Sequence, residues 1–316
     1  MTRCSWRVGL CGLAFLVVLA ILVPQQVETA KKFSEWSAPV NLGPVVNSAF
    51  EEFLPEMSKD GLSLYFASNR PGPFGGEDIW VSRRATRDDA WDEPLNLGPH
   101  VNTSFNERSP ALSRDGHYLF FATTRPGGSG GFDIWVSWRA HTRDDFGWQP
   151  PVNLGPGVNG AFGDFGPTFF ENDDIGIPNL FFASNRPGVG GVDIYRSELA
   201  ANGSFGPAVL IPELSTPQND FRPTIRPDGL EVFFDSNRPG PPGVPGIGLR
   251  DLWVSTRETP SNTWSTPVNL GSGVNTEFND TLAALSSDGT TLIFTSDRPG
   301  SFGGSDLYMT SRAKHD

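Results

Sequence analysis

The chain has 316 residues, a length that a single repeating all-β domain often reaches. Glycine (36 residues) and proline (28 residues) are frequent while hydrophobic residues make up 37%, which indicates short strands joined by tight turns and excludes disorder. The net charge of −12 should repel phosphate, so nucleic acid and anionic lipid surfaces are excluded as partners.

Residues 1–30 have the pattern of a secretory signal peptide. Arg3 and Arg7 precede or border an apolar run over residues 8–23, and a polar stretch follows up to Ala30. Cleavage after Ala30 would leave an acidic residue three positions back, which fits the small-residue rule poorly. An uncleaved anchor is therefore the alternative, and it would be the only membrane contact. We expect an exported protein, either periplasmic or secreted.

The remaining chain, residues 31–316, is built from five repeats. The first recurring element begins at Trp36, and its copies follow at intervals of 55 to 59 residues. These copies begin at Trp91, Trp148, Phe205 and Trp264. After each copy come a loop that ends in an acid, a short strand, a hairpin turn, an apolar strand, an Arg-Pro-Gly loop and a strand that begins with aspartate.

Four strands are expected in each repeat. Asp60-Gly61 and its counterparts lie between two apolar runs, and Asp-Gly predicts a hairpin because glycine accepts positive φ. In the first repeat the strands are expected to open at Phe53, Leu62, Asp78 and Trp91. Since no stretch shows a helical hydrophobic period, the fold class is all-β. Five tandem units of four strands predict a five-bladed β-propeller over residues 31–316.

The ends of the chain predict how the ring closes. The last repeat stops after its third strand, residues 307–312, whereas the chain opens with an unpartnered fourth strand, residues 36–42. Pairing the first strand with the last blade would complete that blade and leave no exposed edge in the ring. We therefore expect the N-terminal strand to complete the fifth blade.

The repeat also resembles a known family. The segments PEMSKDG at 55–61, LYFASNR at 64–70 and DIWV at 78–81 resemble the repeat of TolB-like propellers, also called WD40-like or PD40 repeats. The resemblance covers residues 33–316 in five copies. TolB itself has six blades and a separate α/β domain, so the resemblance implies the fold rather than the Tol partners.

Strand direction places the conspicuous loops together. The loops before the innermost strands and the Arg-Pro-Gly loops should share one face, here called the top face, and the Asp-Gly turns should lie on the opposite, hairpin face. Five acids at the start of the innermost strands should ring the mouth of the central channel: Glu52, Glu107, Asp164, Asp220 and Asp280. Such a ring would attract cations or sugar hydroxyls.

Hairpin register gives these acids an alternative role. A two-residue turn at Asp60-Gly61 places Glu52 opposite Asn69 and beside Arg70. The same arithmetic gives the pairs Glu107 with Arg125, Asp220 with Arg238, and Asp280 with Arg298. An acid and an arginine that recur together indicate a bidentate ion pair that fixes each blade.

Residues that break the fivefold pattern are better candidates for a specific ligand site. Arg108 and Arg222 follow the ring acids in two blades, Phe53 and Phe165 do so in two others, and Thr281 does so in the last. Charged and aromatic side chains around a channel mouth could hold an anionic or sugar-like ligand, while packing under neighbouring loops is the alternative. Trp138, at the end of a strand, is a candidate exposed aromatic contact.

Neither metal nor cofactor chemistry is indicated. The aspartates after the glycine-rich loops are Asp78, Asp133, Asp193, Asp251 and Asp306. One aspartate per loop falls short of the six to eight oxygens that calcium needs, so we expect these residues to cap loop amides. Both cysteines, Cys4 and Cys11, lie in the predicted signal peptide, and the four histidines occupy unrelated positions in the repeats. We expect no catalytic residue, no metal and no cofactor.

These observations predict a monomeric, non-enzymatic binding or scaffold module that holds a protein or cell-envelope partner at the top face. A lectin-like glycan-binding module is the alternative. A glycoside-processing enzyme is the third reading, because five-bladed rings occur among glycosidases. It is disfavoured by the nearly identical acids of the five blades, since such enzymes depend on a distinct pair of carboxylates.

Overall fold

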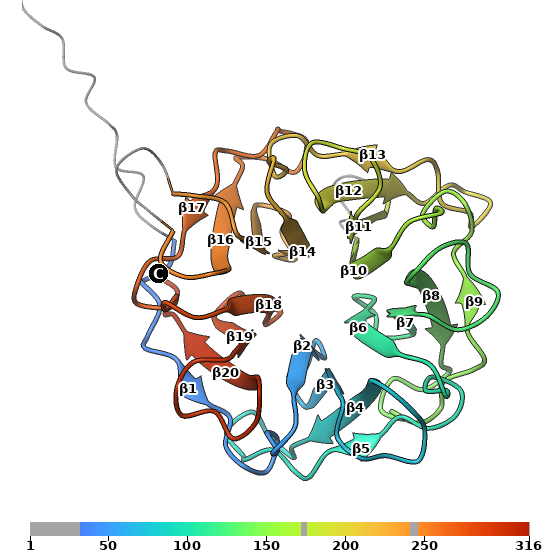
Figure 1. Ribbon diagram of the computed structural model, residues 1–316, viewed down its shortest axis with the longest axis horizontal. Helices are drawn as coiled ribbons and strands as arrows, with labels where there is room; N and C mark the ends of the chain where they lie inside the picture. The colour runs from blue at the N-terminus through green and yellow to red at the C-terminus, as the bar shows by residue number, and fades with distance from the viewer. Residues whose placement is uncertain (1–31, 172–175, 241–245, 316) are drawn as a thin grey trace, which may run out of the picture.

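The computed structural model describes residues 32–171, 176–240 and 246–315. Its regular elements are strands, which form five four-stranded antiparallel sheets around a central axis (Figure 1). The predicted five-bladed β-propeller is confirmed. The predicted signal peptide, residues 1–30, lies outside the described residues. Within the described ranges, no helix is long and apolar enough to cross a membrane.

Each blade runs from an innermost strand at the channel to a short strand at the rim. Blade 1 consists of β2 (Glu52–Met57), β3 (Ser63–Ser68), β4 (Asp78–Arg83) and β5 (Leu95–Asn96). Blade 2 consists of β6 (Glu107–Leu112), β7 (Tyr118–Thr123), β8 (Asp133–Trp138) and β9 (Val152–Asn153). Blade 3 consists of β10 (Asp164–Phe170), β11 (Asn179–Ser184), β12 (Asp193–Glu198) and β13 (Val209–Leu210). Blade 4 consists of β14 (Asp220–Ile225), β15 (Glu231–Ser236), β16 (Asp251–Thr256) and β17 (Val268–Asn269).

Blade 5 is completed by the start of the chain. It consists of β18 (Asp280–Leu285), β19 (Thr291–Ser296), β20 (Asp306–Ser311) and β1 (Val40–Asn41). Val40 pairs with Met309, and Phe33 forms a further antiparallel bridge to Lys314 (Figure 1). The predicted closure is therefore confirmed, and both described ends of the chain lie beside each other. The rim strands, however, are only two residues long, and β5 begins at Leu95 rather than at Trp91.

A β-bulge interrupts every innermost strand. The residue at the bulge has positive φ in all five blades: Leu54 (56°), Ser109 (57°), Gly166 (61°), Arg222 (33°) and Leu282 (56°). A proline follows it in four of the blades. The extra residue shifts the pairing of β2 with β3, so Glu52 pairs with Ser68 and not with Asn69 as the uninterrupted hairpin predicted.

The apolar core lies between adjacent sheets. Phe66 and Trp80 of blade 1, for example, pack with Ile293 and Leu307 of blade 5. Four further clusters of the same kind occupy the other junctions. Because burial of each large apolar side chain contributes about 2 kcal/mol, every blade depends on its neighbours for stability.

Backbone contacts between blades fix the loops of the top face. The first residue of each innermost strand donates its N–H to the preceding blade, as Glu107 does to the carbonyl of Glu77 at 2.7 Å and Glu52 to that of Ser305 at 2.9 Å. A Cβ at Gly303 would collide with the carbonyl oxygen of Phe50, so glycine is required where these loops meet. The predicted gathering of both loop types on one face is confirmed.

Candidate functional site

The five ring acids lie inside the blades and not on the channel surface. The Glu52 carboxylate is completely buried and accepts hydrogen bonds from the backbone N–H of Ser48, the hydroxyl of Ser68 and Nη2 of Arg70, the last at 2.8 Å. Arg70 also donates from the same nitrogen to the carbonyl of Val46. The predicted acid–arginine pair is confirmed, but it is joined by one nitrogen and is not bidentate.

The same ion pair recurs in the other four blades. The pairs are Arg125 with Glu107, Arg186 with Asp164, Arg238 with Asp220, and Arg298 with Asp280. All four acids are also 0% exposed. Because these carboxylates are shielded from solvent and already bonded, the structure does not place the acids at the channel mouth, contrary to the sequence-based expectation. They act as clamps within each blade.

The aspartates that open the third strands cap the glycine-rich loops, as predicted, in four blades. Asp193, for example, accepts hydrogen bonds from the backbone N–H groups of Val189 and Gly190. Asp133, Asp251 and Asp306 accept equivalent bonds. In blade 1 the bond that Asp78 accepts comes instead from the side chain of Asn96. Within the described ranges, no group of three or more His, Cys, Asp or Glu is arranged to hold a metal ion.

Arg222 spans the channel. Its Nη2 atom donates to the carbonyls of Pro55 at 2.5 Å and Pro110 at 3.2 Å, and Nη1 donates to that of Leu282 at 3.3 Å, so blade 4 is bonded to blades 1, 2 and 5. The side chain is only 1% exposed, and this burial lowers the pKa of Arg222 to about 10. Arg222 thus separates an upper cavity on the top-face side from a lower cavity on the hairpin side.

The position of Arg222 differs from the prediction. It occupies the bulge, two residues after Asp220, and Phe221 is the true equivalent of Phe53 in the neighbouring repeat. Phe221 directly follows Asp220, as Phe53 follows Glu52 and Phe165 follows Asp164, so the spacing in the sequence would have identified it.

The upper cavity measures ≈ 160 Å³ and brings together the four pattern-breaking residues that the sequence singled out, Phe53, Arg108, Phe165 and Arg222. Phe221 and Arg250 complete its polar and aromatic lining. The rings of Phe165 and Phe221 stack at a centroid distance of 6.0 Å, and the Arg250 guanidinium lies 4.0 Å from the centre of the Phe221 ring. Aromatic faces and guanidinium groups therefore share one small cavity at the channel mouth.

Three guanidinium groups of this cavity have unpaired donors. The Nε atoms of Arg108, Arg222 and Arg250 are buried and lack a hydrogen-bond partner in the described protein. Because buried donors are usually satisfied, these three atoms leave hydrogen-bonding capacity unused beside the cavity.

The sequence reasoning missed two acids of blade 1, and one of them, Glu77, lies next to Arg108 of the upper cavity. Glu77 Oε2 is 3.8 Å from Arg108 Nε. Burial raises the pKa of Glu77 above its ordinary value, while the Arg108 charge opposes this shift and the Glu51 charge adds to it. In the other blades the position of Glu77 is taken by Phe132, Val192, Arg250 and Ser305, and that of Glu51 by Asn106, Gly163, Asn219 and Asn279. Aligning the five repeats would have revealed both acids.

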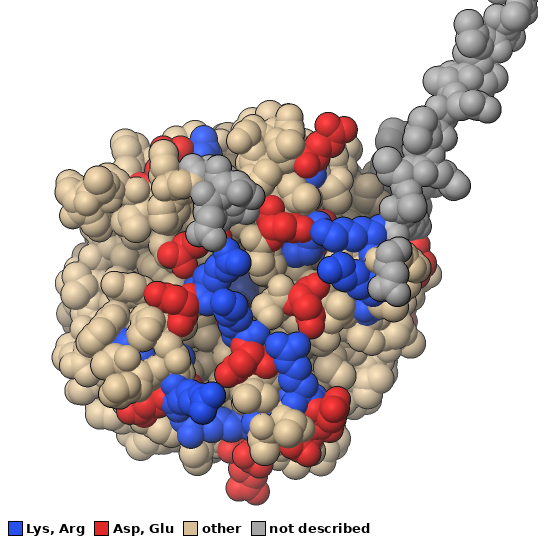
Figure 2. All heavy atoms as spheres, turned by 180° about the vertical axis from the view of Figure 1, so that it is seen from behind, with Lys and Arg blue, Asp and Glu red and all other residues tan. Residues whose placement is uncertain are grey.

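The lower cavity contains a different acid. Glu56 lines this cavity of ≈ 110 Å³, and its Oε2 atom lies 3.7 Å from Nη2 of Arg222. Burial raises the pKa of Glu56 to about 7, although the Arg222 charge and the hydrogen bond from the Leu112 N–H both oppose the shift. Lys59 and Arg114 line the same cavity, and Lys and Arg side chains form a band across the hairpin face (Figure 2).

Several solved structures share the ring fold of this chain. An α-L-arabinofuranosidase from Lactobacillus brevis has 15% sequence identity and a TM-score of 0.59, over 87% of this chain and 93% of that one. An arabinanase from Bacillus subtilis has 14% identity and a TM-score of 0.58, over 86% of this chain and 97% of that one. No protein-family model and no curated protein matches the chain. At these identities the likeness shows the fold alone.

These neighbours correct the functional expectation. A non-enzymatic binding or scaffold module for protein or cell-envelope partners was expected, whereas several solved structures that share the ring over at least 86% of this chain are glycoside hydrolases. A putative TolB from Agrobacterium tumefaciens, with 17% identity over 85% of this chain and 78% of that one, reaches a TM-score of only 0.47. That value is too low to support the TolB-like resemblance.

Proposed function

We propose that the chain is a glycoside-processing enzyme with its substrate site at the upper cavity. The observation that carries this proposal is the set of unpaired Nε donors of Arg108, Arg222 and Arg250 around an aromatic cavity. Sugars present apolar ring faces and many acceptor oxygens, so aromatic rings and guanidinium donors together suit them. The solved glycoside hydrolases of the same fold support the same class of substrate.

Glu77 is the candidate general acid of this enzyme. A general acid in glycoside cleavage must hold its proton near neutral pH, and burial raises the pKa of Glu77 in the required direction. Glu51 is the candidate for the second carboxylate, because it is exposed and its charge acts on the Glu77 carboxyl. Both acids belong to blade 1 alone, which supplies the asymmetry that the ring acids lack.

Hydrolysis of a panel of 4-nitrophenyl glycosides, including the α-L-arabinofuranoside, tests the proposal. We expect Glu77→Gln and Glu51→Gln each to lower kcat/KM at least about 100-fold, as loss of acid–base catalysis does. The exposed Glu93→Gln should leave the rate unchanged. Glu56→Gln should also remain active, because Arg222 separates Glu56 from the upper cavity. Equal activity of all four variants would overturn the assignment of Glu77 and Glu51.

Glycan binding without hydrolysis is the second candidate function. It is favoured by one observation, namely that the residues lining the upper cavity include three phenylalanines and three arginines but no carboxylate. In that case Phe53→Ala would abolish retention on a glycan array. Trp138→Ala would not, although Trp138 is 44% exposed as predicted, because it lies outside the cavity.

We further propose that the repeats are of the TolB-like, PD40 type, supported by the Pro-Glu-Met-Ser-Lys-Asp-Gly segment at 55–61 and its counterparts. Export through residues 1–30 and a monomeric state belong to the same proposal. Detection of the chain in a periplasmic or culture fraction tests the export, and light scattering tests the monomer.

A further inference from the structure

An arginine recurs at the hairpin-side junction between blades. Arg257 stacks on the Trp264 ring at 4.0 Å, and its Nε atom donates to the carbonyl of Gly229 in the hairpin of its own blade. The same arrangement joins Arg84 to Trp91 and Gly61, Arg139 to Trp148 and Gly116, and Arg312 to Trp36 and Gly289. Four of the five junctions therefore hold a guanidinium in the same place.

Two of these arginines are neutralised by a buried carboxylate. Arg139 pairs with Asp145 at 2.6 Å, and Asp145 also accepts hydrogen bonds from Ser63 and Tyr65 of the preceding blade. Arg312 pairs at 2.6 Å with Glu231 of its preceding blade. The two junctions thus use different acids, Asp145 from a loop and Glu231 from a strand, to place a negative charge beside the equivalent arginine.

Arg84 and Arg257 have no ion pair of this kind within the described ranges, and only Arg84 has two nearby acids, Asp88 and Asp89, whose charges offset its own. Arg257 is therefore the least compensated of the four arginines. In the described part of the chain, no carboxylate lies within ion-pair distance of its guanidinium. The sequence explains this lack, because Asn179 replaces Glu231 at the start of the corresponding strand and the loop 258–263 is shorter than the loop that carries Asp145. Burial lowers the pKa of Arg257 to about 10, and the charge of Arg196 on the facing blade adds to the shift. Arg196 pairs with the exposed Glu198 at 3.0 Å, whereas Arg257 has no ion-pair partner in the described ranges.

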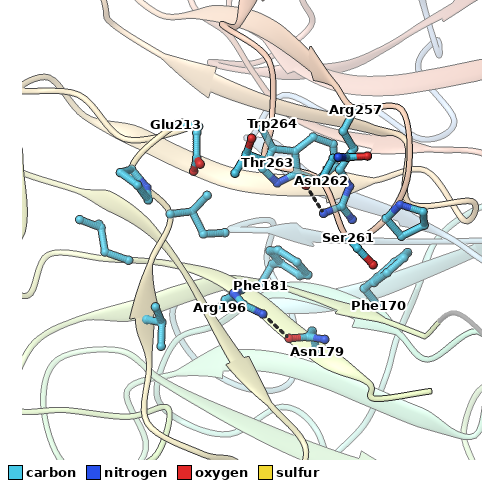
Figure 3. A pocket seen from close by; sticks show the side chains of 15 residues that line it. Phe170, Asn179, Phe181, Arg196, Glu213, Arg257, Ser261, Asn262, Thr263 and Trp264 are labelled. Atoms are coloured by element: carbon cyan, nitrogen blue, oxygen red, sulfur yellow. Dashed lines mark hydrogen bonds between the residues drawn. The ribbon is translucent and has the colours of Figure 1, made fainter. Parts of the chain in front are cut away.

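A groove of ≈ 360 Å³ opens where that carboxylate is lacking (Figure 3). In this interblade groove, Arg196 and Arg257 come from opposite blades, with Phe181 between them and Phe170 next to Ser261. Asn179, Asn262 and Ser261 offer amide and hydroxyl groups along its walls. Glu213 also lines the groove, but it makes no ion pair with either arginine in the described structure. The volume lies in the range of sites for small ligands.

We propose that the interblade groove binds the carboxylate of an acidic sugar, a uronate unit of a glycan. The carboxylate would take the place that Asp145 and Glu231 fill at the other junctions, between Arg257 and Arg196. The amide and hydroxyl groups of the walls match ring hydroxyls, and the two phenylalanines match an apolar sugar face. The two arginines alone support the presence of an anion site, whereas the assignment of the anion to a sugar rests on the proposed function.

Calorimetric titration of the full chain with a galacturonate trimer and with a neutral galactose trimer tests this site. We expect wild type to bind the acidic trimer at least tenfold more tightly and to lose affinity as salt rises. Arg257→Gln should lower affinity at least tenfold. Arg84→Gln is the matched control, since Arg84 makes the same carbonyl and tryptophan contacts and is accompanied by Asp88 and Asp89. It should bind like wild type.

A second variant keeps the test decisive if Arg257→Gln does not fold. Asn262 forms the same turn with Thr259 that Asp89 forms with Thr86, so Asn262→Asp retains the fold and adds a competing carboxylate near Arg257. We expect it to weaken binding of the acidic trimer. Equal affinity of wild type for the two trimers, or undiminished binding by Asn262→Asp, would overturn the proposal.

The remaining outcomes separate this site from its rivals. Binding of a polyglutamate peptide without binding of the acidic trimer would overturn the sugar assignment. Aryl glycoside hydrolysis by Arg257→Gln at the wild-type rate is expected, because the groove and the upper cavity are lined by different residues. A chain that binds the acidic trimer through Arg257 yet hydrolyses nothing would refute the proposed enzyme and leave this inference standing.

Discussion

At the scale of single residues, the channel depends on two opposite charges. The two Nη atoms of Arg222 are bonded to three carbonyls from three other blades, and Glu56 is the acid nearest its guanidinium on the hairpin side. Neither group is well hydrated, which is why burial shifts the pKa of both toward the neutral form. Each therefore depends on the other for its charged state.

Removal of Arg222 should destabilise the ring. Arg222→Met leaves the carbonyls of Pro55, Pro110 and Leu282 without their donor and Glu56 without its counter-charge. We expect a loss of about 3 kcal/mol in the free energy of unfolding, measured by urea denaturation. Arg108→Met, which removes a half-buried guanidinium that bonds no carbonyl across the channel, should cost less than about 1 kcal/mol. Equal losses would argue against a structural role for the spanning contact.

Glu56 should make the stability of the protein depend on pH. Its pKa is about 7 in the folded protein against an ordinary value of 4.5, so the folded state binds the proton more tightly. The contribution is fully present below pH 4.5 and is lost as pH rises through 7, by about 3 kcal/mol in all. Glu56→Gln lacks this loss. Its unfolding free energy relative to wild type should therefore rise between pH 5 and 7.5, whereas Glu93→Gln should show no such trend.

At the scale of elements, each blade is held by the clamp between the start of its innermost strand and the loop after its second strand. The clamp carboxylates are fully buried, and the clamp arginines are nearly so. A buried ion pair of this kind contributes little net stability compared with an apolar pair, but loss of one partner leaves an uncompensated charge.

Loss of a clamp arginine should accordingly lower the stability of the folded protein strongly. Arg238→Met strands the Asp220 carboxylate, which is 0% exposed, and we expect a loss of about 4 kcal/mol in the free energy of unfolding by urea. Lys32→Met removes the exposed partner of Asp228 and should change stability by less than about 1 kcal/mol. A similar small change in both variants would show that Asp220 gains its proton at little cost.

The sequence predicts features that recur and misses those that depend on a neighbour. Five blades, closure by the N-terminal strand, the Glu52–Arg70 pair and its counterparts, and the loop caps all follow from residues repeated at fixed spacing. The bulge at Leu54 could not be predicted, because nothing in the sequence indicates that this leucine has a positive φ. The predicted register of the hairpin was therefore wrong by one residue. The bonds of Arg222 reach residues more than 100 positions away, and no local pattern encodes them.

The candidate site shows the same division. Phe53, Arg108 and Phe165 were found because they differ from one repeat to the next. Glu77 occupies an equally irregular position, but it precedes a third strand and not one of the repeated ring acids. The unpaired state of Arg257 could be recognised only in three dimensions, since it reflects an acid that the preceding blade does not supply.

At the scale of the whole molecule, the ring closes through two residues of β1 and the contacts that flank them. Val40 and Asn41 pair in register with β20, and the Phe33–Lys314 bridge and backbone hydrogen bonds from Ser34, Ser37 and Leu42 extend the seam on either side. So short a seam leaves the fifth blade as the point where unfolding should begin.

A covalent seam should therefore raise the stability of the ring. Val40→Cys combined with Met309→Cys places two thiols directly opposite each other, in a chain with Cys4 and Cys11 replaced by serine. Closing so long a loop should raise Tm by about 5 °C under oxidising conditions in scanning calorimetry. The gain should vanish with reductant and be absent in Val40→Cys alone. An unchanged Tm in the oxidised form would show that unfolding begins in another blade.

The side-by-side ends at Phe33 and Lys314 make the order of the blades along the chain arbitrary. A short linker could join the ends, and the backbone could be cut in the exposed hairpin at Asp115-Gly116 without altering any junction between sheets. Such a circular permutant would begin in blade 2 and still present an unchanged top face. The same adjacency means that a tether attached at either end leaves the molecule at the hairpin side, so an immobilised protein would hold its upper cavity toward the solution.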